Sequence, residues 1–164
     1  MERIVVCTGP GNFNGIRASI SALKGVCCSL PIQLMGVNKF QVLSKICKSS
    51  LISLKYRGDK IYWCILKDEK PIFMSSSEIK DIRPSDDYSD LAVVGYRAEE
   101  IATRIKVKKF IEQNEISTRD FLKFSRKVLN PDNFSPKPLY ISPSRSLFTK
   151  YKGPKILDKP SDVC

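Results

Sequence analysis

Short apolar runs alternate with amphipathic stretches over the first part of the chain. Residues 3–8 are mostly apolar and end at Gly-Pro-Gly, which predicts a strand. Apolar side chains then recur at the spacing of one helix face, with Asn14 as the expected N-cap and Pro31 as the stop. This stripe consists of Ile16, Ile20, Leu23, Cys27 and Leu30. A strand over 32–37 and a helix over 40–48 follow, and this order predicts a right-handed parallel unit of an α/β fold.

The middle of the chain changes to strand patterns. Three apolar runs separated by short polar turns predict an antiparallel meander over 51–56, 60–66 and 71–74. The further expected elements are a short helix over 77–82, a strand over 91–95, a helix over 98–105, a strand over 107–111 and a helix over 117–129 capped by Thr118.

The end of the chain is rich in proline. Six of the ten prolines lie at or after Pro131, which predicts an extended tail. We expect Leu139, Tyr140 and Ile141 to dock part of this tail on the core. The whole pattern predicts a first lobe over residues 1–49, a second α/β lobe over 50–130, and a Pro- and Lys-rich tail over 131–164.

The composition limits the chemistry. Lys and Arg number 28 against 17 Asp and Glu, a formal net charge of +11 that suits a polyanionic partner or a solvated lysine-rich surface. The chain has no histidine, which excludes Ser-His-Asp and Cys-His catalysis and histidine-based metal motifs. Its six cysteines form no C-x-x-C pair, so we predict no metal site. No apolar run reaches the roughly 18 residues of a membrane span, and we expect a cytoplasmic protein with no membrane contact.

The stretch GPGNFNGIR, residues 9–17, is the most informative motif. Gly9, Gly11 and Gly15 lack the spacing of both the Rossmann fingerprint and the P-loop. A glycine-rich turn before a helix nevertheless exposes backbone N–H groups, and Arg17 could add a cation, so these four residues are candidates for contact with a phosphate. The alternative is a tight strand-to-helix turn in which glycine permits positive φ.

The helix that follows carries a second feature. Small residues line a face beside its apolar stripe: Ala18, Ser21, Ala22, Gly25 and Ser29. Such a face either lets another helix approach closely or packs within the chain. The remaining candidates are weaker. We interpret Asp86, Asp87, Glu99 and Glu100 as surface residues, and Trp63 as a core residue. The lysines of residues 137–159 form either a solvated tail or a contact with a nucleic-acid backbone.

Residues 4–17, IVVCTGPGNFNGIR, resemble the Gly-Pro-Gly-Ser-Phe-Thr-Gly-Ile/Val-Arg signature of the TsaB (YeaZ) family. Shorter stretches are also similar to family patterns: ALKGV at 22–26, Pro31-Ile32 with Gly36-Val37, Ile61-Tyr62-Trp63, and Pro138-Leu139-Tyr140-Ile141. The resemblance runs from about Ile4 to Ser142. It departs at Asn12 and Asn14, where the family has Ser and Thr, and at Ser142, where it often has Arg.

The resemblance implies an actin/Hsp70-like ATPase fold built on ribonuclease H-like lobes. It also implies a non-catalytic subunit that pairs with TsaD, is joined by TsaE, and serves threonylcarbamoylation of the adenosine next to the tRNA anticodon. Metal and catalysis then belong to TsaD, and ATP or ADP is held, if at all, at the TsaD interface. The implied interface residues are Asn12, Phe13, Ala18, Ser21, Ala22 and Gly25, used for TsaD or for a homodimer.

Family members usually begin with about 60 further residues, which include an Asp-Thr-Ser strand. We therefore expect the first lobe to be incomplete, with an exposed edge on the strand over 3–8, through a misplaced start, a split gene or a completing partner chain. The main hypothesis is a scaffold or activator subunit that docks to TsaD and meets tRNA through the complex. The alternatives are a stand-alone nucleotide-binding ATPase and a basic tRNA-binding domain.

Overall fold

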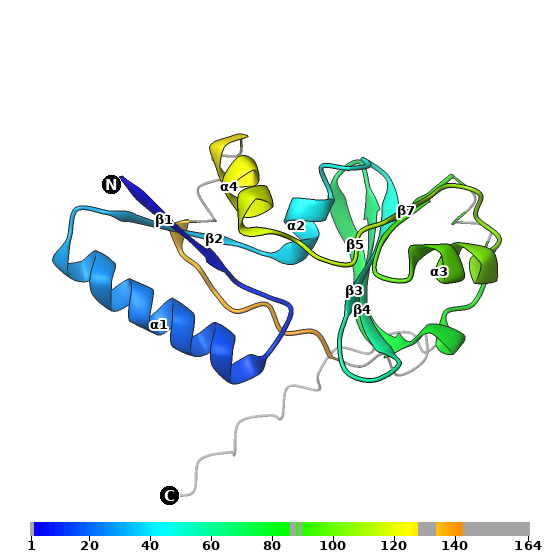
Figure 1. Cartoon of the computed structure of the whole chain (residues 1–164), viewed down its shortest axis with the longest axis horizontal. Helices are drawn as coiled ribbons and strands as arrows, with labels where there is room; N and C mark the ends of the chain where they lie inside the picture. Colours follow the sequence, from blue (N-terminus) through cyan, green and yellow to red (C-terminus); the bar gives the residue numbers. More distant parts are fainter. Residues whose placement is uncertain (1, 86–87, 89, 128–133, 143–164) are drawn as a thin grey trace, which may run out of the picture.

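The computed structural model describes residues 2–85, 88, 90–127 and 134–142. Its elements follow the chain as two groups that lie side by side (Figure 1). The first group is built on β1 (Arg3–Cys7), α1 (Phe13–Ser29), β2 (Gln33–Val37) and α2 (Lys39–Leu43). The second group holds β3 (Ser50–Lys55), β4 (Lys60–Lys67), β5 (Lys70–Glu78), the 3₁₀ turn η1 (Ile79–Asp81), β6 (Ala92–Gly95), α3 (Ala98–Ile105) and β7 (Phe110–Glu112). The helix α4 (Thr118–Lys127) returns to the first group.

β1 and β2 form a parallel pair, with Arg3 opposite Gln33 and Cys7 opposite Val37. α1 and α4 lie on opposite sides of this pair, because alternate strand residues point to opposite faces (Figure 1). The side chains that pack under α1 are Ile4, Val6 and Leu34, and those that pack with Phe124 of α4 are Val5, Met35 and Val37. Within the described residues β1 has one strand neighbour, β2.

The second sheet has five strands in the order β5-β4-β3-β6-β7. β3, β4 and β5 run antiparallel, as the meander predicts, and β6 and β7 join parallel to β3. α3 covers one face around the fully buried Trp63, and Phe40 and Leu43 of α2 cover part of the other. The predictions of an α/β fold and of Trp63 as a core residue are confirmed.

Three segments cross between the two groups of elements. Residues 44–49 lead from α2 to β3, and residues 113–117 lead from β7 to α4. Residues 134–142 form the third crossing: Pro136 lies against β2 at Gly36, and Leu139 and Ile141 pack on the cluster around Tyr62 and Leu54. The predicted docking of residues 139–141 is confirmed.

Several predicted boundaries are wrong for local reasons. The N-cap of α1 is Asn12, not Asn14, because the Asn12 side chain accepts the N–H of Gly15. The expected helix over 40–48 ends at Leu43. After it, Ile46 donates its N–H to the Leu43 carbonyl in a turn, and the chain continues into β3. The expected helix over 77–82 shrinks to one 3₁₀ turn, because Ser77 and Glu78 pair with β4.

Two later boundaries also shift. The last strand is Phe110–Glu112, because Val107 is buried and donates its N–H to Ala102 at the end of α3. Ser117 caps α4 in place of Thr118, since its hydroxyl accepts the N–H of Asp120. Glu99 and Glu100 lie exposed at the start of α3, as predicted. The expectations for Asp86, Asp87, residues 128–133 and the lysines beyond Ser142 fall outside the described part of the chain.

Candidate functional site

The Gly9–Asn12 turn joins β1 to α1 and is fixed from two sides. Gly9 has a φ of +113°, a conformation that side chains other than glycine rarely adopt, and the Gly9–Pro10 peptide bond is cis. The Gly9 carbonyl accepts the N–H of Lys39, the first residue of α2, at 2.8 Å. The neighbouring Thr8 carbonyl accepts the N–H of Leu139, also at 2.8 Å. The first strand, α2 and the C-terminal segment therefore all position this turn.

The start of α1 satisfies much of its own hydrogen bonding. Asn12 Oδ1 accepts the Gly15 N–H at 2.8 Å, and Pro10 has no N–H to offer. The Arg17 guanidinium lies 5.0 Å from the centre of the Phe13 ring, in a cation–π contact. Phosphate contact by Gly9, Gly11, Gly15 and Arg17 stays a prediction, and an anion would compete with the Asn12 cap for the Gly15 amide.

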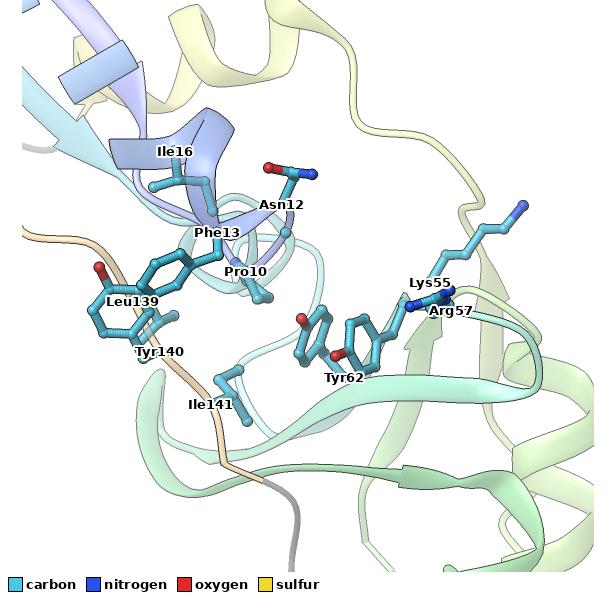
Figure 2. A pocket seen from close by; sticks show the side chains of 12 residues that line it. Pro10, Asn12, Phe13, Ile16, Lys55, Arg57, Tyr62, Leu139, Tyr140 and Ile141 are labelled. Atoms are coloured by element: carbon cyan, nitrogen blue, oxygen red, sulfur yellow. The ribbon is translucent and has the colours of Figure 1, made fainter. Parts of the chain in front are cut away.

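A cleft of about 620 Å³ opens between this turn and the second sheet. Phe13 and Tyr140 lie on one side, Tyr62, Lys55 and Arg57 lie on the other, and Pro10 lies between them (Figure 2). The full lining is Pro10, Gly11, Asn12, Phe13, Ile16, Lys55, Tyr56, Arg57, Tyr62, Leu139, Tyr140 and Ile141. The cleft thus gathers residues from four separate segments of the chain.

Aromatic rings pair on both sides of the cleft. The Phe13 and Tyr140 ring centres are 5.0 Å apart, and those of Tyr56 and Tyr62 are 4.3 Å apart. Burial, and after it the neighbouring Tyr56, raises the pKa of Tyr62 above its ordinary value, which moves this phenol further from ionisation. The lining includes two cations, Lys55 and Arg57, and no carboxylate. This combination favours an anionic partner with flat, apolar surfaces.

The second candidate surface is the outer face of α1. Only Ile20 is buried among the 17 residues of this helix. Four residues of its predicted apolar stripe, Ile16, Ile20, Leu23 and Cys27, pack on β1 and β2. The fifth, Leu30, is 49% exposed, because the helix ends at Ser29 and Leu30 is extended. The predicted interface residues are all exposed: Asn12, Phe13, Ala18, Ser21, Ala22 and Gly25. A Cβ atom added at Gly25 would meet no heavy atom within 4 Å. The small residues therefore do not pack on the chain's own sheet, and the face is open to a partner.

Two further observations on the described residues concern metal binding and membrane crossing. In that part of the chain no three His, Cys, Asp or Glu side chains gather closely enough to hold a metal ion. No helix there is long and apolar enough to cross a membrane.

The comparisons with known proteins concern the fold. YeaZ from Pseudomonas aeruginosa superposes with a TM-score of 0.61 at 15% sequence identity, over 85% of this chain and 74% of that one. A structure described as an uncharacterized protein with similarity to peptidase YEAZ from Pseudomonas aeruginosa superposes with a TM-score of 0.58 at 16% identity, over 85% and 73% of the two chains. The chain has the YeaZ fold. No protein-family model and no curated protein matches the sequence.

The YeaZ fold agrees with the resemblance of residues 4–17 to that family's signature, and the comparison confirms this prediction at the level of the fold. In this chain the signature forms the turn and the first residues of α1, between the cleft and the open helix face. Lys55, Tyr56 and Arg57, which line the cleft, are not among the predicted site residues. Their only signal was the alternation of cation, aromatic and cation just before the hairpin at Gly58.

Proposed function

We propose that this chain is a non-catalytic docking subunit of the tRNA threonylcarbamoyl-transferase complex, and that α1 binds the catalytic subunit TsaD. The observation that carries the proposal is the uncovered outer face of α1. The YeaZ fold and the signature of residues 4–17 support it. The finer fold assignment, an actin/Hsp70-like ATPase fold, belongs to the same proposal, as does the assembly with TsaE.

The chemistry of the α1 face suits a helix-to-helix contact. Ala18, Ser21, Ala22 and Gly25 form a shallow centre, which lets a partner helix come as close as the small side chains allow. Val26, four residues after Ala22 and therefore next to it on the helix surface, adds an exposed apolar side chain near the end of α1. A larger apolar side chain beside a small-residue centre would add affinity to such an interface.

We assign no catalytic residue and no cofactor to this chain. The chain has no histidine, and the Asn12 side chain already accepts the Gly15 amide that a phosphate would use. Any ATP or ADP of the complex would then be held at the interface with TsaD. A stand-alone ATPase is the weaker hypothesis for the same reason.

The experiment is size-exclusion chromatography with light scattering of this chain, alone and mixed with TsaD of the same organism. We expect a one-to-one complex for the wild type and none for Ala22→Arg or Gly25→Arg. Thr103→Arg is the matched control, because it adds the same charge to an exposed helix position on α3. The proposal fails if both α1 variants fold, as judged by circular dichroism, and still bind TsaD like the control.

A further inference from the structure

We propose that the cleft between the Gly9–Asn12 turn and the β3–β4 hairpin binds single-stranded nucleic acid, with an unpaired base stacked on its aromatic side chains. This proposal goes beyond docking to TsaD. It rests on aromatic side chains from both walls of the cleft and on the cations of the β3–β4 wall, and its tests use variants of that wall in the chain alone.

The first argument is where the exposed aromatic rings lie. Among the described residues, four large aromatic side chains are strongly exposed: Phe13 at 50%, Tyr56 at 46%, Phe110 at 45% and Tyr140 at 55%. Three of these four line this cleft, and only Phe110 lies elsewhere. Exposed flat rings that gather at one cleft offer stacking surfaces, and every nucleobase has a face that can use them.

The second argument is charge. Lys55 and Arg57 flank Tyr56 at the end of β3, and both are exposed at the cleft. The lining holds no carboxylate that would repel a phosphate or neutralise these cations. The Lys39 ammonium also lies close to the turn, within 3.8 Å of the place where a Cβ on Gly11 would stand. Cations beside stacking rings are the combination that single strands need, because phosphates and bases alternate along them.

The third argument separates a strand from a free nucleotide. A glycine-rich turn before a helix binds the phosphates of a free nucleotide through its unsatisfied backbone N–H groups. Here Pro10 has no N–H, and Asn12 Oδ1 occupies the Gly15 N–H at 2.8 Å. The cations instead belong to exposed side chains of the wall opposite Phe13, and the Lys55 side chain extends outward, with its ammonium 5.8 Å from the centre of the Tyr96 ring (Figure 2). Such a layout favours a polymer, which gathers affinity from several weak stacking and phosphate contacts along its length.

The test uses fluorescence anisotropy with a labelled oligoriboadenylate of about ten nucleotides, within the site sizes known for single-strand binders. Tyr56→Ala should weaken binding by roughly five-fold to a hundred-fold, the range measured for loss of one base–aromatic stack. Tyr56→Phe keeps the ring and should bind like the wild type. Phe110→Ala is the matched control, since it removes an equally exposed ring on β7 outside the cleft.

Salt dependence tests the cations separately. Removing one phosphate contact lowers the slope of log affinity against log salt by about 0.7 for a single strand. Arg57→Ala and Lys55→Ala should each show this change. Arg119→Ala removes the same charge from an exposed position on α4 and should leave the slope unchanged. If Tyr56→Ala fails to fold, these exposed variants decide the question alone.

Three results would overturn the proposal. One is equal binding by the wild type and a folded Tyr56→Ala variant, or an equal loss in Phe110→Ala. Another is equal affinity for an abasic oligonucleotide of the same length, which would mean that only charge is recognised. The third is displacement of the probe by ATP at lower concentration than by unlabelled oligoriboadenylate, which would assign the cleft to a free nucleotide. Loss of TsaD binding by α1 variants has no bearing on these outcomes, because none of the variants used here lies on α1.

Discussion

Replacing Gly25 by alanine should make the isolated chain more stable and its complex with TsaD weaker. Gly25 lies inside α1, where alanine is favoured over glycine by about 0.8–1.0 kcal/mol. A new methyl group would meet nothing within 4 Å, so no packing cost offsets this gain. For a chain of this length, a gain of about 1 kcal/mol raises the melting temperature by about 2–4 °C. At a close helix contact, the same methyl group should cost about 1–3 kcal/mol of binding through overpacking.

The assay is thermal unfolding followed by circular dichroism at low protein concentration, paired with titration against TsaD. Gly58→Ala is the control, because Gly58 also has open space around its Cβ position but adopts a φ of +59°. It should therefore lose about 1 kcal/mol, since alanine is strained in the left-handed region. A destabilised Gly25→Ala monomer would refute the reasoning, because it would mean that the chain itself covers this face. A stabilised monomer with unchanged TsaD affinity would show that no helix approaches Gly25 closely.

Three further predictions test other parts of the structure. Gly95→Ala should destabilise the chain by about 2 kcal/mol or more, because Gly95 has a φ of +118° and the new Cβ would clash with the Ser53 carbonyl oxygen. Urea unfolding measures this loss, and a midpoint equal to that of the wild type would contradict the prediction. Burial raises the pKa of the Cys64 thiol to about 12, so at pH 8 iodoacetamide should alkylate the exposed Cys28 and leave Cys64 untouched in the native protein, as read by mass spectrometry. Hydrogen bonds from Ser117 lower the pKa of Asp120 in the folded chain. The ionised carboxylate should therefore stabilise the fold above its unfolded-state pKa of about 3.9, and this effect should disappear as the pH falls through the lower folded-state pKa. The urea midpoints of the wild type and of Asp120→Asn should differ at pH 6 and converge in strong acid.

Helices and strands are predicted correctly where hydrophobic periodicity and turn residues within the segment itself determine them. The strand over 3–8, the stripe that starts at Ile16, and the meander around Trp63 all follow from periodicity and turn residues. The N-cap was misplaced because Asn12 and Asn14 are chemically equivalent, and only the hydrogen bond to Gly15 distinguishes them.

The cleft could not be predicted, because its walls meet only through tertiary contacts. Tyr56 comes from the end of β3, Phe13 from α1, and Tyr140 from the C-terminal segment. The prediction that residues 139–141 dock was correct, but nothing in their pattern shows that they dock beside Phe13. The exposure of the small α1 residues could not be read from sequence either, since packing within the chain and packing on a partner need the same residues.

The three crossings between the two groups of elements have a mechanical consequence for the cleft. Two groups of elements joined by a single linker can rotate about it as a hinge. A ligand that binds between them then loses binding free energy to the ordering of this motion. Here three segments connect the two groups: residues 44–49, 113–117 and 134–142. The third segment is also held to the first group by the hydrogen bond from Leu139 N–H to the Thr8 carbonyl. We therefore expect the width of the cleft to be set when the chain folds, so that ordering the protein costs a bound ligand little free energy.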